Sequence, residues 1–243
     1  MADTLKNEFI RFCRLRLGMK PLIDYAQSRS NLAGVADLSI RTVFDVGANV
    51  GKMAKYYRRL FPKATIYCFE PLPVCCRKLY RWAQRQDGKV RVFNLALGSE
   101  PGEMTFYYNP RCSTASSLLP PSDVDSSAAS KWIKMPVRVE TLDRVAATLD
   151  IEDEIFVKID AEGFDMEVIR GGSNVIQRAS AVILEARTFE SPSDRPGFAE
   201  YLRTMTDLGY MYRGNLHQAY VRGQIRCADA VFIKPPKARR LAA

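Results

Sequence analysis

The sequence lacks the patterns that mark a secreted, zinc-stabilised or membrane-embedded protein. Its six cysteines form no C-x-x-C pair and no zinc-ligand spacing. The longest apolar runs are far shorter than the roughly 18 residues that a membrane span requires. Acids and bases occur throughout the first residues, which therefore contain no apolar core of a secretory signal. We expect a cytoplasmic protein with free thiols, including the adjacent Cys75 and Cys76.

The composition is that of an ordinary globular protein, with 47% hydrophobic and 26% charged residues among 243. A chain of this length buries enough surface to fold without disulfides or metals. Composition and element order predict a helical segment over residues 1–40, one domain over 41–235, and a basic tail over 236–243. Within the domain, a stretch rich in Ser, Pro and Asp at about 109–133 is expected to be an inserted loop.

Positive charge is in excess, with 36 Lys and Arg against 27 Asp and Glu, a formal net charge of +9. Such a surface attracts phosphate, nucleic acid or an anionic membrane. Leu5, Phe9 and Phe12 share one face of the expected N-terminal helix, so peripheral membrane contact is conceivable, although a helix docked on the core explains them too. No nucleic-acid motif accompanies the charge, and a nucleic-acid partner is disfavoured.

Strands and helices are predicted to alternate along the chain. Strand patterns occur at 41–45, 65–70, 90–95, 155–160 and 181–185, with helical patterns at 50–60, 71–86, 164–170 and 198–208. Extended runs at 104–108 and 135–140 flank the inserted loop, and short strands at 210–213 and 230–234 close the domain. This alternation predicts an α/β fold with a parallel sheet covered by helices on both faces.

A glycine turn ends the first of these strands, in the run from Asp45 through Gly47, Asn49 and Gly51. Glycine allows a ligand to approach the backbone closely, and ligands bind at the carboxyl ends of strands in such sheets. Glu70 ends the second strand, 23 residues after Gly47, where an acid can accept hydrogen bonds from a ribose diol. The combination predicts a ligand that carries a nucleoside.

Two features of this turn favour S-adenosylmethionine over NAD. The second glycine of the dinucleotide fingerprint G-x-G-x-x-G is replaced by Asn49. Asp45 would place a carboxylate where a pyrophosphate binds, which repels phosphate and suits a ligand with an ammonium or sulfonium group.

Five segments in order, VFDVGANVG, CFEP, NLALG, VRVETLD and VKIDAEGFDMEVIRGG, resemble the FkbM family of S-adenosylmethionine-dependent methyltransferases. The resemblance covers about residues 41–190. It implies a class I methyltransferase-like Rossmann fold with a seven-stranded, mostly parallel sheet, and methyl transfer to hydroxyl oxygens of sugars or polyketides. Length and basic character are also similar to rhizobial enzymes that methylate the fucose of nodulation factors.

Matching positions imply which residues bind the cofactor. Asp45 and the stretch from Gly47 through Asn49 to Gly51 match the loop at the methionine end. Glu70 matches the acid at the ribose, and Asn94 to Ala96 fall where the adenine edge is read.

Methyl transfer to an alcohol needs a group that removes the hydroxyl proton. Asp160, Glu162 and Glu185 follow or end two central strands, and could supply a base or together hold Mg²⁺. Glu162 could instead cap the next helix, with Asp160 bonded to backbone amides. His217, the single histidine, is a further candidate base in an expected loop.

Two tryptophans could stack on a sugar ring. Trp82 falls in a helical pattern and is expected to pack there, whereas Trp132 ends the serine-rich loop and is the better candidate for an acceptor contact.

The leading hypothesis is O-methylation of a sugar hydroxyl in a glycolipid or oligosaccharide. Methylation of a macrolide or other polyketide is the alternative, and an NAD-dependent oxidoreductase or a nucleic-acid-binding domain is more distant.

Overall fold

The computed structural model describes residues 32–121, 132–187, 196–221 and 223–235. The predicted N-terminal helix, the basic tail and residues 122–131 of the inserted loop lie outside this range, as does Cys13.

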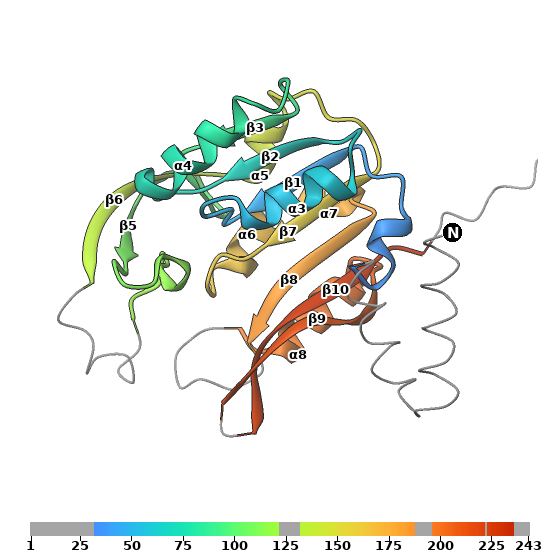
Figure 1. Cartoon of the computed structure of the whole chain (residues 1–243). Coiled ribbons are helices and arrows are strands. Elements are labelled where there is room, and N and C mark those ends of the chain that lie inside the picture. The colour runs from blue at the N-terminus through green and yellow to red at the C-terminus, as the bar shows by residue number, and fades with distance from the viewer. Residues whose placement is uncertain (1–31, 122–131, 188–195, 222, 236–243) are drawn as a thin grey trace, which may run out of the picture.

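A seven-stranded sheet forms the centre of the molecule, in the order β3-β2-β1-β7-β8-β10-β9 (Figure 1). Strands β3, β2, β1, β7 and β8 are parallel, and β10 pairs antiparallel with both β8 and β9. The predicted mostly parallel sheet is therefore confirmed. Its strands are β1 (Thr42–Val46), β2 (Thr65–Phe69), β3 (Val90–Phe93), β7 (Ile155–Ile159), β8 (Ala181–Arg187), β9 (Met211–Val221) and β10 (Gln224–Ile233).

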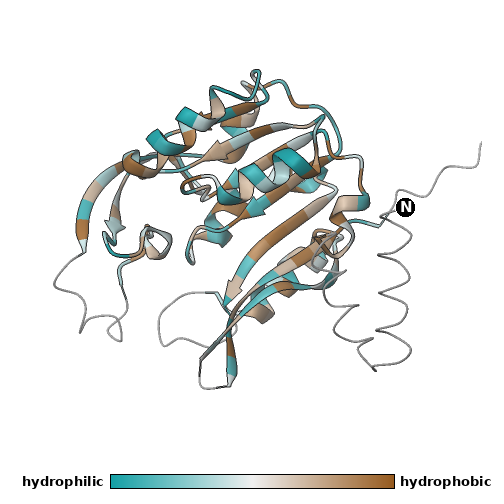
Figure 2. Cartoon of the chain, viewed as in Figure 1, coloured by the Kyte–Doolittle hydropathy of each residue, from teal (hydrophilic) through white to brown (hydrophobic). Residues whose placement is uncertain are grey.

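Helices cover both faces of this sheet. One face carries α3 (Lys52–Leu60), α4 (Pro73–Ala83) and the 3-10 helix η1 (Leu32–Asp37). The other carries α5 (Leu142–Ala146), α6 (Asp165–Gly171), α7 (Ser173–Arg178) and α8 (Phe198–Asp207). Every residue of β1 and β7 is buried, as expected of parallel strands covered on both sides. Figure 2 shows the resulting apolar colouring along the central strands.

A second, three-stranded sheet packs beside the first, in the order β4-β6-β5. Its strands are β4 (Ala96–Leu97), β5 (Gly102–Tyr108) and β6 (Ile133–Glu140). Sequence periodicity predicts one strand over 90–95, but the structure ends β3 at Phe93 and begins β4 at Ala96. The cause is Asn94, whose side-chain amide donates to the carbonyls of Glu70 and Pro71, 2.9 Å away in each case, and so turns the chain into the second sheet.

The closing strands are much longer than predicted. Strands β9 and β10 form an antiparallel pair with three register irregularities, and Gly214 adopts φ +129° within β9. The strand therefore continues through Gly214, whereas the sequence suggested that it ends before this glycine. His217 consequently lies within β9 rather than in a loop, which corrects the prediction.

Two minor predictions are confirmed. Trp82 packs against the core on the α3–α4 face, with the Lys55 Nζ 5.7 Å from its ring centre. Cys75 and Cys76 are free, buried thiols on α4. Of the helices within the described ranges, none combines the length and apolar character needed to cross a bilayer.

Candidate functional site

A cavity opens at the carboxyl ends of β1, β2 and β7 and encloses about 920 Å³, its solvent-filled mouth included. The loop after β1, the turn after β2 and the segment after β7 contribute its polar groups. Its apolar wall comes from the second sheet, from the segment between β5 and β6, and from residues at the starts of α4 and α6. The apolar lining includes Leu72, Leu95, Ala96, Leu97, Phe106, Leu118 and Phe164. An apolar lining beside a few polar groups suits a ligand such as a nucleoside.

Gly47 brings the loop after β1 against the neighbouring strand. Its φ is +76°, and a Cβ at this position would lie 1.9 Å from the carbonyl oxygen of Asp160. The amides of Gly47 and Ala48 both donate to the carbonyl of Phe69 at 3.0 Å. These contacts exclude any side chain here and fix the loop between β2 and β7.

Asn49 joins three parts of the cavity. It adopts a left-handed conformation with φ +48°, which asparagine tolerates better than most residues. Its backbone amide donates to Glu70 Oε2 at 2.8 Å, and its side-chain amide donates to Ser113 Oγ at 3.2 Å. Ser113 begins η2 (Ser113–Ala115), within the segment that covers the cavity. The residue that breaks the dinucleotide fingerprint thus connects the loop to both the acid and the covering segment.

Asp45 carries a buried carboxylate that forms no salt bridge within the described residues. The residue is fully buried, and neither of its oxygens has a hydrogen-bond partner among the described residues. Burial raises the pKa of Asp45 to about 6, the nearby Lys158 cation lowers it, and the Asp160 charge raises it. A buried, unpaired anion is unfavourable in an empty cavity and becomes favourable when a cationic ligand binds.

Glu70 is 4% exposed and directs its carboxylate into the same cavity. The amides of Leu72 and Asn49 donate to Oε1 and Oε2, both at 2.8 Å. Burial raises the pKa of Glu70 to about 7, against these two amides, which lower it. Each oxygen keeps a lone pair for another donor, which matches the two hydroxyls of a ribose.

The other predicted cofactor residues differ in their placement. Ala96 lines the apolar wall, whereas Asn94 is exposed and lies outside the cavity, because its amide is bonded to the turn after β2. Gly51 is not among the lining residues either. It begins α3 with φ +81°, and a Cβ there would approach Leu79 Cδ1 to 2.4 Å, so its role is to let α3 pack on α4.

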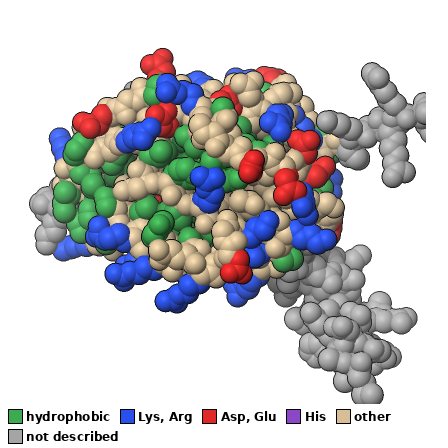
Figure 3. All heavy atoms as spheres, turned by 90° about the horizontal axis from the view of Figure 1, so that it is seen from above, with side chains coloured by type: hydrophobic (Ala, Val, Ile, Leu, Met, Phe, Trp, Pro, Cys, Tyr) green, Lys and Arg blue, Asp and Glu red, His purple; other side chains and the backbone are tan. Residues whose placement is uncertain are grey.

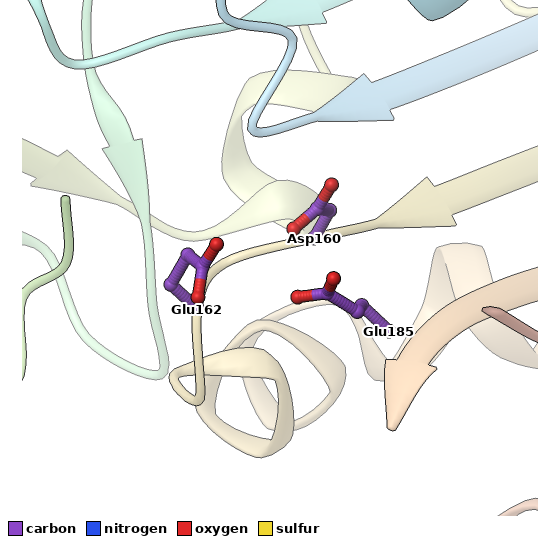
Figure 4. A group of neighbouring side chains, drawn as sticks. All are labelled: Asp160, Glu162 and Glu185. Atoms are coloured by element: carbon purple, nitrogen blue, oxygen red, sulfur yellow. The ribbon is translucent and has the colours of Figure 1, made fainter. Parts of the chain in front are cut away.

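Asp160, Glu162 and Glu185 come together beside the cavity, as the sequence predicted (Figure 4). One carboxylate oxygen from each lies within 4.8 Å of the other two. Asp160 and Glu162 also line the cavity itself. The carboxyl ends of the neighbouring strands β7 and β8 thus bring three acids to one edge of the sheet.

Two cations accompany these acids. The Lys158 Nζ is 2.6 Å from Asp160 Oδ2, and the Arg187 guanidinium is 2.9 Å from Glu162 Oε2. Burial and the Asp160 charge raise the pKa of Glu162 to about 7, while Arg187 lowers it. Burial, followed by the charges of Asp160 and Glu162, raises the pKa of Glu185 to about 9. At neutral pH Glu185 therefore holds a proton.

The donor set of three carboxylates matches what Mg²⁺ prefers. However, the protein's own Lys158 and Arg187 already neutralise two of the three acids, and Glu185 is neutral. The charge that a divalent cation would balance is thus largely balanced by the chain, and we derive no step through a metal.

The sequence reasoning missed Lys158 and Arg187. Both lie two residues from an acid on their own strand, in the runs Lys-Ile-Asp and Glu-Ala-Arg, and residues at that spacing share one face of a strand. Lys158 is 5% exposed within an otherwise apolar strand. A lysine in such a run must have a buried acidic partner, and this signal was available in the sequence.

Two predicted acceptor residues do not join the cavity. His217 is exposed on β9, at the edge of the sheet and two strands beyond β8. Trp132 is half-buried just before β6 and is not among the lining residues. In place of Trp132, the described part of the inserted loop covers the cavity with Ser113, Thr114, Ser116 and Leu118.

Comparison with known proteins gives a family match. The model of the methyltransferase FkbM domain matches residues 45–212. Hexuronic acid methyltransferase AglP of Haloferax volcanii is 26% identical over 152 residues, which cover 63% of this chain and 58% of that protein. The 2-O-methyltransferase NoeI of Sinorhizobium fredii is 25% identical over 153 residues, which cover 59% of this chain and 62% of that protein. The chain thus spans about three fifths of the length of these curated relatives.

Among solved structures, the fold is similar to that of methyltransferase FkbM from Methylobacillus flagellatus KT. The TM-score is 0.50 at 13% identity, and the match covers 80% of this chain and 44% of that one. This similarity supports the predicted class I methyltransferase-like fold.

Proposed function

The chain belongs to the methyltransferase FkbM domain family, and on this premise we propose that it is an S-adenosylmethionine-dependent O-methyltransferase acting on a sugar hydroxyl. The observation that supports this most is the pair of buried acids in one cavity. Asp45 is an unpartnered anion, and Glu70 has lone pairs free for a diol. A nucleoside with a positively charged arm complements both.

The residues present fit this cofactor. Asp45 lines the cavity and can attract the positively charged methionine end of the cofactor. Glu70 can accept hydrogen bonds from the ribose hydroxyls. Ala96 lies in the apolar wall on which the adenine would pack. When bound, S-adenosylmethionine supplies a methyl group activated by its bond to a sulfonium sulfur. A dinucleotide fits less well, because Asp45 repels a pyrophosphate.

Glu162 is the best-placed proton acceptor for the hydroxyl. It lines the cavity, and its pKa of about 7 keeps about half of it ionised near neutral pH. Glu185 is protonated at that pH and can donate a hydrogen bond to the same hydroxyl oxygen or to Glu162. Asp160 is held by Lys158 and orients the pair electrostatically.

The acceptor is proposed from the relatives. The name of one relative specifies a hexuronic acid, which favours a sugar hydroxyl as the acceptor. We extend this to a sugar within a glycolipid or oligosaccharide. Fucose of a nodulation factor stays a prediction of the resemblance alone.

Calorimetric titration of the full chain with S-adenosylhomocysteine and, separately, with NADH tests the cofactor. We expect micromolar binding of S-adenosylhomocysteine and none of NADH. Glu70→Gln removes charge-assisted hydrogen bonds to the ribose, each of which contributes about 1.5–3 kcal/mol, so affinity should fall roughly 10- to 100-fold.

Glu103→Gln makes the same chemical change at an exposed residue of β5 and should leave affinity unchanged. Failure of the folded protein to bind S-adenosylhomocysteine, or equal binding of NADH, would contradict the proposal.

Glu162→Gln tests the proton acceptor. In the wild type, kcat should rise with pH through about 7, because the carboxyl must lose its proton before it can accept another. The variant should lose this rise and about 10²- to 10⁴-fold in kcat, while its affinity for S-adenosylhomocysteine stays within about 2-fold. The measurement is a pH–rate profile with a methylatable sugar acceptor.

Glu200→Gln, at an exposed residue of α8, is the matched control and should keep the wild-type profile. A Glu162→Gln enzyme with the wild-type rise near pH 7 would exclude Glu162 as the base.

A further inference from the structure

The two faces of the sheet differ sharply in the charge of their helices. Helices α3 and α4 contain seven Lys or Arg residues and no Asp or Glu. On the opposite face, α5, α6, α7 and α8 together contain four Arg and five Asp or Glu. Among the helices, the excess of positive charge therefore lies on the face that carries α3 and α4, where η1 adds the single acid Asp37. The seven basic residues, here called the basic face, are Lys52, Lys55, Arg58, Arg59, Arg77, Lys78 and Arg81.

Ion pairing differs in the same way. Three of the four arginines on the opposite face, Arg144, Arg170 and Arg178, are each paired with an acid. Within the described residues, no salt bridge joins a member of the basic face to an acid. Unpaired positive charges concentrated on one face repel one another, and an anionic partner relieves that repulsion.

Helix stability accounts for only part of this pattern. Arg58, Arg59 and Arg81 lie in the last turns of their helices, where the helix dipole favours cations. Lys52, in contrast, is the first residue of α3, where the dipole disfavours a cation, and neither helix has an acid in its first turn. Lys52 also lines the cavity, so the basic face reaches its edge.

Apolar side chains are exposed among the cations. On α4, Val74 is 36% and Tyr80 is 53% exposed, next to the exposed Arg77, Lys78 and Arg81. Figure 3, seen from the top of Figure 1 where α4 lies, shows an apolar area bordered by Lys and Arg side chains, with Asp and Glu side chains also present on this face. Tyrosine and aliphatic groups between clustered Lys and Arg are typical of surfaces that contact the headgroup region of a bilayer.

We infer that the basic face docks the protein on an anionic phospholipid membrane, with Arg77 and Arg81 as its main contacts. Both α3 and α4 begin at the cavity, so docking holds the cavity edge near the lipid surface. Nucleic acid is the less suitable partner, because the face offers one exposed tyrosine rather than a series of stacking groups. The inference does not depend on methyl transfer.

Sedimentation of the full chain with sucrose-loaded vesicles tests it. We expect binding to vesicles of phosphatidylcholine with phosphatidylglycerol, weakening with salt, and little binding to phosphatidylcholine alone. Arg77→Glu with Arg81→Glu should lower the partition coefficient by at least roughly 10-fold, since each change replaces an attraction to anionic lipid by a repulsion. Arg77→Gln with Arg81→Gln should give an intermediate loss.

Arg178→Glu with Arg203→Glu makes the same charge change on exposed residues of α7 and α8, and should keep wild-type partitioning within about 2-fold. Thermal unfolding and titration with S-adenosylhomocysteine check that each variant is folded, and keep failure of docking distinct from failure of the proposed function.

The inference is overturned if neutral vesicles bind equally well. It is also overturned if Arg77→Glu with Arg81→Glu binds like the wild type, which would place binding in another basic segment. The inference is also overturned if the protein binds single-stranded RNA but not vesicles, and loses RNA binding when these two arginines are replaced.

Discussion

Replacing Asp45 by asparagine is expected to reduce affinity for S-adenosylhomocysteine by roughly 100-fold or more, because the buried carboxylate loses the charge that attracts the amino group of the ligand. The same substitution should make the ligand-free protein relatively more stable as pH rises. The carboxylate has no hydrogen-bond partner among the described residues, so in the absence of ligand its ionisation is unfavourable.

The direction of this pH effect follows from the raised pKa. Well below pH 3.8, Asp45 is protonated in both folded and unfolded chains. Between its ordinary pKa of 3.8 and about 6, the folded chain retains a proton that the unfolded chain has lost, so the wild type loses stability as pH rises through this window. At 1.36 kcal/mol per pKa unit, the loss is about 3 kcal/mol, and asparagine does not titrate.

Chemical denaturation at pH 4 and pH 7.5, with calorimetric titration at pH 7.5, measures both effects. Asp207→Asn, at an exposed residue of α8, is the control and should alter neither the pH dependence nor the affinity. Parallel stability curves for Asp45→Asn and the wild type, or unchanged affinity, would show that Asp45 is not an unpaired anion that awaits a cationic ligand.

Lys158→Met should cause the largest loss of stability. Burial lowers the pKa of Lys158, but the charges of Asp160 and Asp45 outweigh burial and raise it overall, so the side chain is charged throughout the neutral range. Its removal leaves Asp160 without its ion-pair partner and takes away the nearby positive charge that lowers the pKa of Asp45. Breaking a buried ion pair in this way destabilises a protein by about 3–5 kcal/mol.

The loss in Lys158→Met should be smaller at pH 5 than at pH 7.5, because Asp45 then carries a proton. Adding Asp160→Asn should recover part of the stability, since a second unpaired charge is removed. Lys55→Met makes the same change at a half-buried lysine. Among the described residues its Nζ is near a backbone carbonyl and the Trp82 ring and forms no salt bridge, so the change should cost less than about 1 kcal/mol. Equal losses in the two methionine variants, measured by denaturant unfolding, would contradict the assigned role.

The local sequence was sufficient to predict the cavity but not all of its residues. Asp45, Gly47 and Glu70 were predictable because Asp45 lies near the end of a strand, and the other two directly follow strands, whose apolar runs are visible without any partner. The acidic cluster was predictable because the carboxyl ends of parallel strands meet at one edge. The bonds of Asn94 and the placement of His217 were not, since both depend on contacts between segments distant in sequence.

The pairings of Lys158 and Arg187 illustrate the same limit. Their positions indicate charged groups on strands, but not which acid each one meets. Arg187 lies closer in sequence to Glu185, yet it binds Glu162, which comes from the preceding strand–helix connection. The pairing of β7 with β8 determines which acid Arg187 meets, and the pattern of apolar residues along each strand does not reveal that pairing.

Strand register has a consequence for engineering the cavity. Asp45 and Lys158 are direct partners in the ladder between β1 and β7, so the main chain itself fixes their spacing. A one-residue insertion in either strand, ahead of the charged residue, would move that residue to the opposite face of the sheet. The segment over Ser113–Leu118, by contrast, is attached by one isolated bridge between Tyr107 and Ser117 and by a few side-chain bonds. A designer who wants a different acceptor would therefore graft a new covering segment and leave the charged strands as they are.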